Sequence, residues 1–439
     1  MAASDDLKIA WQQVSAKQAY QKRCFDYYDG DQPLAYTTKR LRDIFKSFQM
    51  NFSANWCAVV IDAVLDRLDL LGMAEDEAVM EQFKPWWDAA NVETEARLVH
   101  EYALLTGEAF ATIWPNETTH LPELYANDPR VCHVQYDGEN PRTQLWAAKF
   151  WTANDGKYRA TLYYPDRLEY WQTKKKREGV TEVKAFTLEN EETNPFDQIP
   201  IFHWRIHARR MKSDLDPVRP LQDAINKLLA DMMVAAEYGA FKQRYTIGEA
   251  ATKGQIKNAP NEIWDLPEGM TVGEFSATEL VNYLKAIENL VGQIGSITFT
   301  PRHFFLQNTS AQASGEALIA QDGPLVAKVE DRIQAFSPTW QAAFQFVAKL
   351  MGADESIIIP QWGPAEIIPP LTRATILQTY RNAGMPLAAA LREVGYEAQE
   401  IATIAEEQAT EDRARRASLG EMVAQAQVDF SQGGVDDET

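Results

Sequence analysis

Apolar residues recur at helical spacing in the first hundred residues. Between residues 51 and 71 one helix face is apolar at Val60, Ile61, Val64, Leu65 and Leu68. Gly72 follows this face at the place where a helix would end. A second pattern of the same period runs over residues 93–105 and ends at Gly107. The N-terminal part is therefore predicted to be helical.

The period changes after residue 107. From about residue 108 to residue 207 the sequence consists of short runs rich in aromatic and β-branched side chains, separated by Asp137-Gly138, Asn154-Asp155-Gly156 and Asn194-Pro195. Within one run, alternate residues from Tyr158 to Tyr164 share a face, and Arg159 and Thr161 lie on the other. We expect several antiparallel strands here.

Two helical patterns then enclose a segment of turn-forming residues. Residues 220–241 begin with Pro220 in the first turn and carry a continuous apolar stripe. A second helix follows after Ser276 and Glu279, which have the spacing of a capping box. The glycines and prolines of residues 242–275 favour short strands. The sequence thus predicts a helical stalk that ends in a small β-rich tip.

The remaining third combines a polar loop with further helices. Residues 299–315 form the loop, which Phe304 and Phe305 are expected to anchor, and a long helical pattern then reaches about Gly352. Pro324, after Gly323, cannot donate a hydrogen bond to the Ala320 carbonyl, so a kink is expected there. After a proline-rich connector, residues 371–407 are predicted to form short helices interrupted at Gly384 and Gly395.

Composition and charge narrow the class of protein. At about 150 residues per domain, a chain of 439 residues should form about three units. Its net charge of −20 disfavours tight binding of nucleic acid, which requires an excess of Lys and Arg. Three widely spaced cysteines, Cys24, Cys57 and Cys132, suit a reducing compartment rather than a disulfide framework or a zinc site. We expect neither a signal peptide nor a membrane span.

The sequence lacks the common catalytic and cofactor motifs. There is no phosphate loop, dinucleotide fingerprint, zinc-protease motif or nucleophile elbow. His203 and His207 alternate with apolar residues, so we interpret them, with Arg205, as the polar face of a strand, on which the two rings lie too far apart for one ion. We therefore expect no catalytic residues, no metal site and no cofactor.

Other groups of chemically notable residues have simpler interpretations. Asp62, Asp66 and Asp69 could bind a metal, but a solvated helix face or salt bridges explain them more simply. Residues 174–177, Lys-Lys-Lys-Arg, form the basic run of the chain and fit a solvated hairpin tip, with a phosphate contact as the alternative. The tryptophans Trp86, Trp87 and Trp171 are interpreted as core or interface residues.

The order of these segments resembles the portal, or head-to-tail connector, protein of tailed bacteriophages, and most closely the portals of actinobacterial siphophages. The resemblance covers about residues 10–410 and rests on segments that occur in the same order. These segments are Tyr27-Tyr28-Asp29-Gly30, residues 51–71, residues 199–202 with Asp214 and residues 220–227, residues 314–318 with 324–330, and Gly384-Met385-Pro386.

The resemblance implies an α+β portal fold with defined parts. It implies a helical and β-rich wing over residues 1–215, with stem helices over residues 216–241 and 276–296 and a small β-rich clip between them at 242–275. A tunnel loop would follow at 297–315, and the long kinked helix with its connector, again wing, at 316–370. Residues 371–410 would form the helical crown and residues 411–439 a disordered tail.

The resemblance also implies a function in the virion. Portal proteins form a ring, expected to be a dodecamer, at one capsid vertex, through which double-stranded DNA enters during packaging and leaves during ejection, without sequence specificity. The implied partners are the terminase large subunit, the head–tail adaptor, and the major capsid and scaffold proteins, with assembly in the host cytoplasm and no membrane. The negative chain suits a conduit, because DNA would be repelled rather than bound.

Site residues are expected in three places. The resemblance implies that Gln307, Asn308, Thr309, Ser310 and Gln312 of the tunnel loop face DNA, and their small polar groups suit a moving duplex. Gly323 and Pro324 mark the helix kink. Candidate clip contacts with phosphate or terminase are Lys242, Arg244, Lys253 and Lys257.

Two other classes of protein remain as alternatives. A neck adaptor or minor capsid protein would also be structural, but such proteins are usually much shorter and have no stalk. A metal-dependent nuclease could be built on Asp62, Asp66 and Asp69, but the sequence shows no complementary group of ligands.

Overall fold

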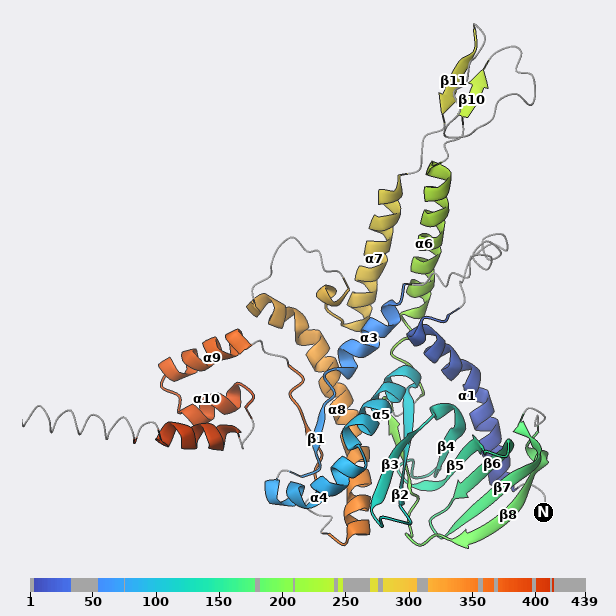
Figure 1. Ribbon diagram of the computed structural model, residues 1–439, viewed down its shortest axis with the longest axis vertical. Coiled ribbons are helices and arrows are strands. Elements are labelled where there is room, and N and C mark those ends of the chain that lie inside the picture. The colour runs from blue at the N-terminus through green and yellow to red at the C-terminus, as the bar shows by residue number, and fades with distance from the viewer. Residues whose placement is uncertain are drawn as a thin grey trace, which may run out of the picture. The chain divides into compact units, whose positions relative to one another are not determined.

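The structure is a computed structural model in which two compact units can be described separately: residues 1–311 with 321–365, and residues 312–320 with 366–439. The described residues are 4–32, 54–74, 76–177, 182–207, 210–240, 244–247, 269–274, 279–305, 315–353, 358–366, 370–396, 400–410 and 413. Helices and strands are both abundant (Figure 1), and the predicted α+β class is confirmed.

The helices of the first unit are α1 (Asp5–Asp29), α3 (Trp56–Leu65), α4 (Glu77–Ala89), α5 (Val92–Thr106), α6 (Arg219–Ala240), α7 (Leu280–Thr298) and most of α8 (Gly315–Met351). Short 3-10 turns are η1 (Pro129–Val131), η3 (Val183–Ala185) and η4 (Arg302–Phe304). The strands are β1 (Leu70–Gly72), β2 (Glu108–Pro115), β3 (Pro122–Asn127), β4 (Cys132–Tyr136), β5 (Gln144–Thr152), β6 (Lys157–Tyr163), β7 (Arg167–Lys176), β8 (Phe186–Thr193), β9 (Ile201–Arg205), β10 (Arg244–Ile247), β11 (Thr271–Glu274) and β12 (Gln361–Trp362).

Two sheets form the β-rich body predicted after residue 107. Strands β4 to β8 make a five-stranded antiparallel meander, and β2 lies between β3 and β9 in a three-stranded antiparallel sheet. One face of the meander packs on Leu7, Ala10 and Val14 of α1. Its other face packs on the three-stranded sheet through Phe110 and Ile201.

Helices cover the opposite face of the three-stranded sheet, which places the main core there. On β9, Phe202 and Trp204 face α8, where Trp204 lies 4.6 Å from the ring of Trp340 and Phe202 lies 5.8 Å from that of Phe346. Because side chains alternate along a strand, Ile201 and His203 face the meander instead. The strand is therefore buried on both faces.

Local signals explain where the first helices begin and end. The Ser4 hydroxyl accepts a hydrogen bond from the Leu7 amide at 3.2 Å, and Gly30 ends α1 in the left-handed region at φ 80°. Helix α5 ends at Gly107, as predicted, with φ 89°. A Cβ added to Gly107 would lie 2.4 Å from the Lys212 backbone nitrogen, so glycine is required there on two grounds.

The helix predicted over residues 51–71 is wrong in its extent. Helix α3 ends at Leu65, and Leu70–Gly72 is strand β1, which pairs with β12. Residues 51–53 lie outside the described residues. The apolar run continued through both elements because both are buried in the same core, so periodicity alone did not separate them.

In the second unit, α9 (Pro370–Asn382) and α10 (Leu387–Glu393) confirm the prediction of short helices. Gly384 and Gly395 follow them with φ 87° and 86°, the conformation in which glycine commonly follows a helix end. A further helical stretch covers residues 400–410.

Candidate functional site

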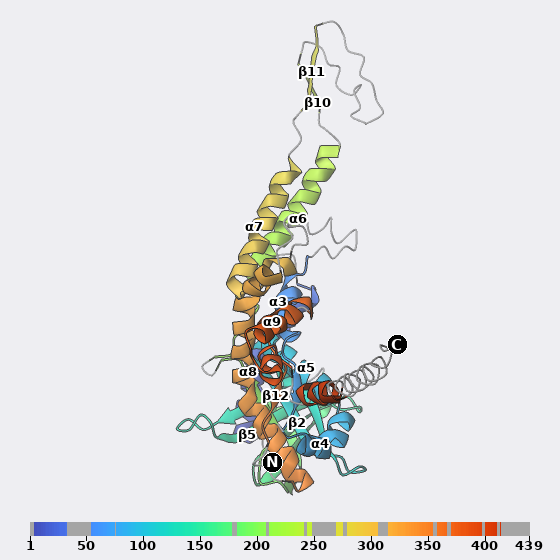
Figure 2. The ribbon, with the colours of Figure 1, turned by 90° about the vertical axis from the view of Figure 1, so that its left-hand side faces the viewer.

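The two helices predicted as a stalk are α6 and α7, which run side by side in both views (Figure 1, Figure 2). Helix α7 begins at Leu280, with Glu279 as a cap residue that makes no side-chain cap hydrogen bond, so the expected capping box does not start this helix. Ser276 lies outside the described residues.

The N-terminal part of α6 is fixed to the body by buried polar side chains. Gln222 accepts a hydrogen bond from the Trp56 amide at 3.0 Å, and Asn226 accepts one from the Ala54 amide at 3.2 Å. The Tyr27 hydroxyl donates to Asp223 at 2.7 Å. These contacts tie α6 to α1 and to the start of α3, so the helix pair has a rigid base.

Large apolar side chains remain exposed on the helix pair. Toward the C-terminal end of α6 and the N-terminal end of α7, Met233, Val281 and Leu284 are 41%, 55% and 47% exposed. At the other end of α7, Ile297 and Phe299 are 44% and 57% exposed. Antiparallel pairing brings Met233 to the same end of the pair as Val281 and Leu284. A single chain thus leaves apolar surface uncovered at both ends of these helices.

The segment between α6 and α7 contains the antiparallel pair β10–β11, with Arg244 opposite Glu274 and Ile247 opposite Thr271. The prediction of short strands in this segment is confirmed. Of the candidate clip contacts, Arg244 lies on β10, and Lys242, Lys253 and Lys257 lie outside the described residues. Their role as contacts stays a prediction.

The predicted tunnel-loop residues Gln307, Asn308, Thr309, Ser310 and Gln312 all lie outside the described residues. The chain on the N-terminal side of the loop is described. Phe305 is buried, with its ring 5.8 Å from that of Trp56, so it anchors this segment as expected. Phe304 is 37% exposed and lies against His303 instead, so its expected anchoring role is wrong.

Helix α8 continues through both Gly323 and Pro324. Pro324 and Phe299 together line two neighbouring hollows, of about 500 and 310 Å³. Phe299 has a φ of 60°, a left-handed conformation that is costly for a bulky side chain. The expected kink at Gly323 and Pro324 stays a prediction.

An ion pair fixes α8 just before Pro324. The guanidinium of Arg67, which is buried, donates to Asp322 at 2.7 Å and to the Ala365 carbonyl at 3.4 Å. His303 approaches the other Asp322 oxygen at 3.6 Å. The start of this part of α8 is therefore attached to the end of α3.

A second buried cluster fixes α8 on the other side of Pro324. Lys328 and Arg332 lie 3.1 and 2.9 Å from the two oxygens of Asp214. Burial alone would raise the pKa of Asp214, but the two cations outweigh this effect and lower it. Pro324 is thus flanked by two ion clusters that hold the helix to the body.

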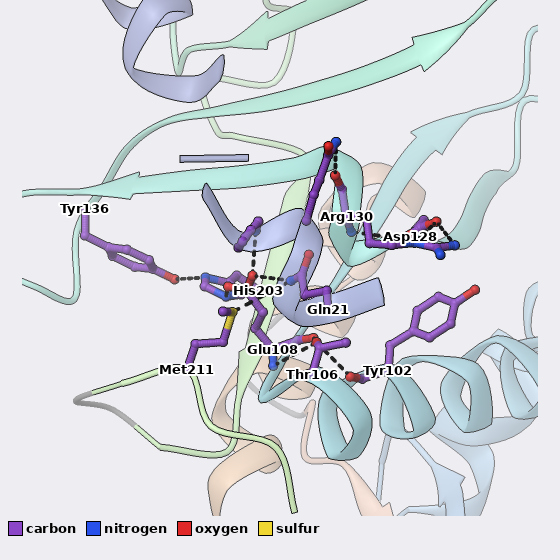
Figure 3. A network of polar contacts seen from close by, with 11 residues as sticks. Gln21, Tyr102, Thr106, Glu108, Asp128, Arg130, Tyr136, His203 and Met211 are labelled. Carbon is purple, nitrogen blue, oxygen red and sulfur yellow. Dashed lines mark hydrogen bonds and ion pairs between the residues drawn. The ribbon is translucent and has the colours of Figure 1, made fainter. Parts of the chain in front are cut away.

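A third network joins α1 to both sheets (Figure 3). Glu108 accepts hydrogen bonds from Lys17 at 2.5 Å and Gln21 at 3.0 Å, and lies 3.2 Å from His203. Burial would raise the pKa of Glu108, but Lys17 and His203 lower it to about 2. Burial lowers the pKa of His203, so a neutral ring donates from Nε2 to Glu108 and accepts at Nδ1 from Tyr136.

The interpretation of His203 as part of a polar strand face is wrong. His203 is buried, stacked on Phe110 at 4.4 Å between the two sheets, and His207 lies beyond the end of β9. The sequence carried no local signal for this arrangement, because Lys17 and Glu108 are distant from His203 in the chain.

The acidic residues of the α3 region have separate partners. Asp62 accepts a hydrogen bond from the Tyr28 hydroxyl at 2.8 Å, and Asp66 pairs with Arg97 at 2.7 Å. Within the described ranges, no group of three or more His, Cys, Asp or Glu side chains is arranged to hold a metal ion. No helix of the described part of the chain is long and apolar enough to cross a membrane.

The remaining predictions concern core aromatics and cysteines. Trp86, Trp87 and Trp171 are buried, which confirms them as core residues. The three cysteines are buried free thiols.

Comparison with known proteins identifies relatives among phage proteins. The portal protein of Mycobacterium phage D29 is 26% identical over 66% of this chain and 64% of its own length. The portal protein of Mycobacterium phage L5 is 23% identical over 66% of this chain and 63% of its own length. The match thus spans less than two thirds of either relative.

Solved structures with similarity to the chain come from the neck of a GTA particle. A chain from the native particle, computed with C12 symmetry, aligns with a TM-score of 0.47 and 12% identity, over 82% of this chain and 94% of that chain. A chain from the empty particle, computed with C6 symmetry, gives 0.44 and 12%, over 82% and 95%.

The family described as phage portal protein, SPP1 Gp6-like, matches residues 60–414. This match covers well over half of the 439 residues. The chain therefore belongs to the SPP1 Gp6-like family of phage portal proteins.

Proposed function

We propose that this protein is the subunit of a portal ring at one vertex of a phage capsid. Double-stranded DNA would enter the capsid through the ring during packaging and leave through it during ejection. Membership of the portal family supports this proposal. A ring of twelve copies is the expected assembly, and its role is structural rather than enzymatic.

The observation that carries the proposal is the exposed apolar surface of α6 and α7. Full burial of an exposed side chain of this size contributes about 1.5–3 kcal/mol. Met233, Val281 and Leu284 are 41–55% exposed within one chain, so about half of that contribution, roughly 1 kcal/mol each, remains to be gained. A helix pair with apolar residues outside its own seam needs further neighbours. Adjacent copies in a ring would supply them, because each copy presents the same helices to the next.

The charge of the chain suits a conduit. Copies of net charge −20 would repel a duplex and so prevent capture. We propose that the loop residues Gln307, Asn308, Thr309, Ser310 and Gln312 face the DNA with small polar groups. The kink at Gly323 and Pro324, between two anchored parts of α8, would direct the helix toward this loop.

We also propose, from the portal family, a role for the segment between α6 and α7 and a set of partner proteins. The segment between α6 and α7 would be the clip, where the terminase large subunit docks during packaging and a head–tail adaptor docks afterwards. Arg244, together with Lys242, Lys253 and Lys257, would contribute to these contacts. Major capsid and scaffold proteins would surround the ring, which would assemble in the host cytoplasm.

The proposal is tested by charging the apolar surface of α7. Native mass spectrometry should find the parent as a ring of about a dozen copies, and the Val281→Asp, Leu284→Asp double variant as smaller species with unchanged circular dichroism. The control, Asn282→Asp with Asn289→Asp, adds two carboxylates at exposed polar positions of the same helix and should keep the ring. Assembly unaffected by the apolar substitutions would contradict the proposed interface.

A further inference from the structure

The basic run of the chain projects from the end of β7. Lys174, Lys175 and Lys176 are exposed, and Arg177 follows them directly. Among the described residues, none of the four side chains has a carboxylate within ion-pair distance. In a chain of net charge −20, four consecutive cations without an ion-pair partner in the described part of the chain are a local exception.

Strand pairing brings a further cation to the same place. Lys157 on β6 lies opposite Lys176 on β7, and like charges directly opposite one another destabilise a sheet. Asp155 is shared between Lys157 at 4.0 Å and Arg159 at 3.4 Å. The local carboxylate is thus occupied, and the repulsion at Lys176 remains uncompensated within the described chain.

Arg177 also borders a hollow of about 600 Å³ between α1 and η1. Lys22 and Arg130 line the same hollow, and each is paired with a carboxylate at 2.6 Å, Lys22 with Asp26 and Arg130 with Asp128. The guanidinium of Arg177 lies over the Tyr158 ring at 5.0 Å, and that of Arg130 lies over Phe25 at 4.6 Å. An arginine held flat on an aromatic ring loses little further freedom when it binds an anion. The Arg130 guanidinium already donates from Nε and Nη2 to Asp128. Arg177 donates from Nη1 to the Thr152 hydroxyl at 3.4 Å, which leaves its other N–H groups to bind an anion.

The lining of this hollow favours phosphate over a protein partner. Besides its three cations it contains one carboxylate, Asp128, which is paired with Arg130, and the small or uncharged side chains of Ser15, Gln18, Ala19 and Val131. Protein interfaces depend on large apolar or aromatic anchors, and this lining offers none. Phosphate oxygens, in contrast, need only N–H and O–H donors and positive charge.

We propose that residues 174–177 form a basic surface that binds the phosphate backbone of double-stranded DNA without sequence specificity. This contact lies on the β-rich body and is separate from the proposed channel loop. It relies on the proposed function only for the presence of DNA beside the protein. The negative remainder of the chain keeps the affinity low and strongly dependent on salt.

The test is fluorescence anisotropy of a labelled duplex of mixed sequence, titrated with the full chain between 50 and 200 mM NaCl. Lys175→Glu with Lys176→Glu should weaken binding at least tenfold at the lowest salt. The slope of log affinity against log salt should fall by about 2, because each lost phosphate contact removes about 0.9. The charge-conserving pair Lys175→Arg, Lys176→Arg should bind within about twofold of the parent.

The matched control is Lys84→Glu with Lys349→Glu, which makes the same charge change at exposed lysines on α4 and α8. Equal losses in both double variants would show an effect of net charge alone and overturn the proposal. Unchanged affinity in the Lys175, Lys176 variant would do the same. So would a polyglutamate peptide that binds tighter than the duplex, because it would identify an acidic protein as the partner.

The outcome is separable from that of the proposed function. Ring formation is measured by mass and does not require the basic surface. DNA binding that depends on Lys175 and Lys176 in a chain that never forms rings would support this surface and contradict the portal assembly. Rings that bind DNA equally well with and without Lys175 and Lys176 would support the portal assembly and contradict the basic surface.

Discussion

The guanidinium of Arg67, at the end of α3, lies 2.7 Å from the carboxylate of Asp322 on α8, two positions before Pro324. The Arg67 side chain is 4% exposed and that of Asp322 is 15% exposed. A pair so far removed from water holds its two elements together strongly, because separating them leaves a buried charge without a partner.

We therefore predict that Arg67→Met destabilises the first unit by about 3 kcal/mol, the lower end of the range for breaking a buried pair. Urea unfolding followed by tryptophan fluorescence measures this loss. Arg97→Met is the matched control, because the Arg97–Asp66 pair is 52% and 61% exposed and should contribute less than about 1 kcal/mol. Equal effects of the two substitutions would show that Arg67 has no anchoring role.

Glu108 should make the protein sensitive to acid in a defined range. Its pKa is about 2 in the folded chain and 4.5 as the ordinary value, so its contribution is complete above pH 4.5 and is lost as pH falls toward 2. Lys17→Met removes the main cation and should cost about 3 kcal/mol at pH 7. The difference between parent and variant, measured by urea unfolding, should shrink below pH 4.5. A difference that stays constant to pH 2.5 would contradict the assignment.

His100 should act in a higher pH range. It is fully buried and accepts a hydrogen bond from Trp340 Nε1 at 2.9 Å, and burial lowers its pKa from 6.5 to about 3. Below pH 6.5 the unfolded chain binds a proton that the folded chain does not, so stability falls by up to about 1.4 kcal/mol per pH unit. His100→Gln keeps a hydrogen-bond acceptor for Trp340. It should reduce the pH dependence of the unfolding free energy between pH 6.5 and 4. Parallel curves for the two proteins would refute this role.

Pro324→Ala restores a backbone donor within α8. We expect the variant to fold as well as the parent, since alanine favours a helix interior by about 3 kcal/mol over proline. The straighter helix should impair ring closure, which size-exclusion chromatography would reveal as a shift toward smaller species. Identical elution profiles of variant and parent would contradict a role of Pro324 in ring closure.

The elements that the sequence predicts well are those with strong local signals. Pro220 in the first turn of α6 is a helix start signal, and Gly107 at the end of α5 is a helix stop signal. The structure confirms both. Alternation predicted the buried face of β6 through Tyr158, Ala160 and Leu162. Thr161, on the other face of the strand, is also buried, because the meander is covered on both sides.

The features that depend on distant partners could not be read from the sequence. Strand β1 exists because residues 70–72 pair with residues 361–362. The sequence around Leu70 contains no local signal that identifies this pairing partner. His203 has the spacing of a solvated side chain, and only folding brings Glu108 and Tyr136 to it. The ion clusters of Asp322 and Asp214 likewise join separate segments.

The measurement that tests the central claim most directly is negative-stain imaging of the recombinant protein, combined with its native mass. A portal predicts closed rings of about a dozen copies around a central hole at least as wide as a DNA duplex, about 20 Å. A monomer at every concentration that also cleaves DNA in the presence of magnesium would contradict the account.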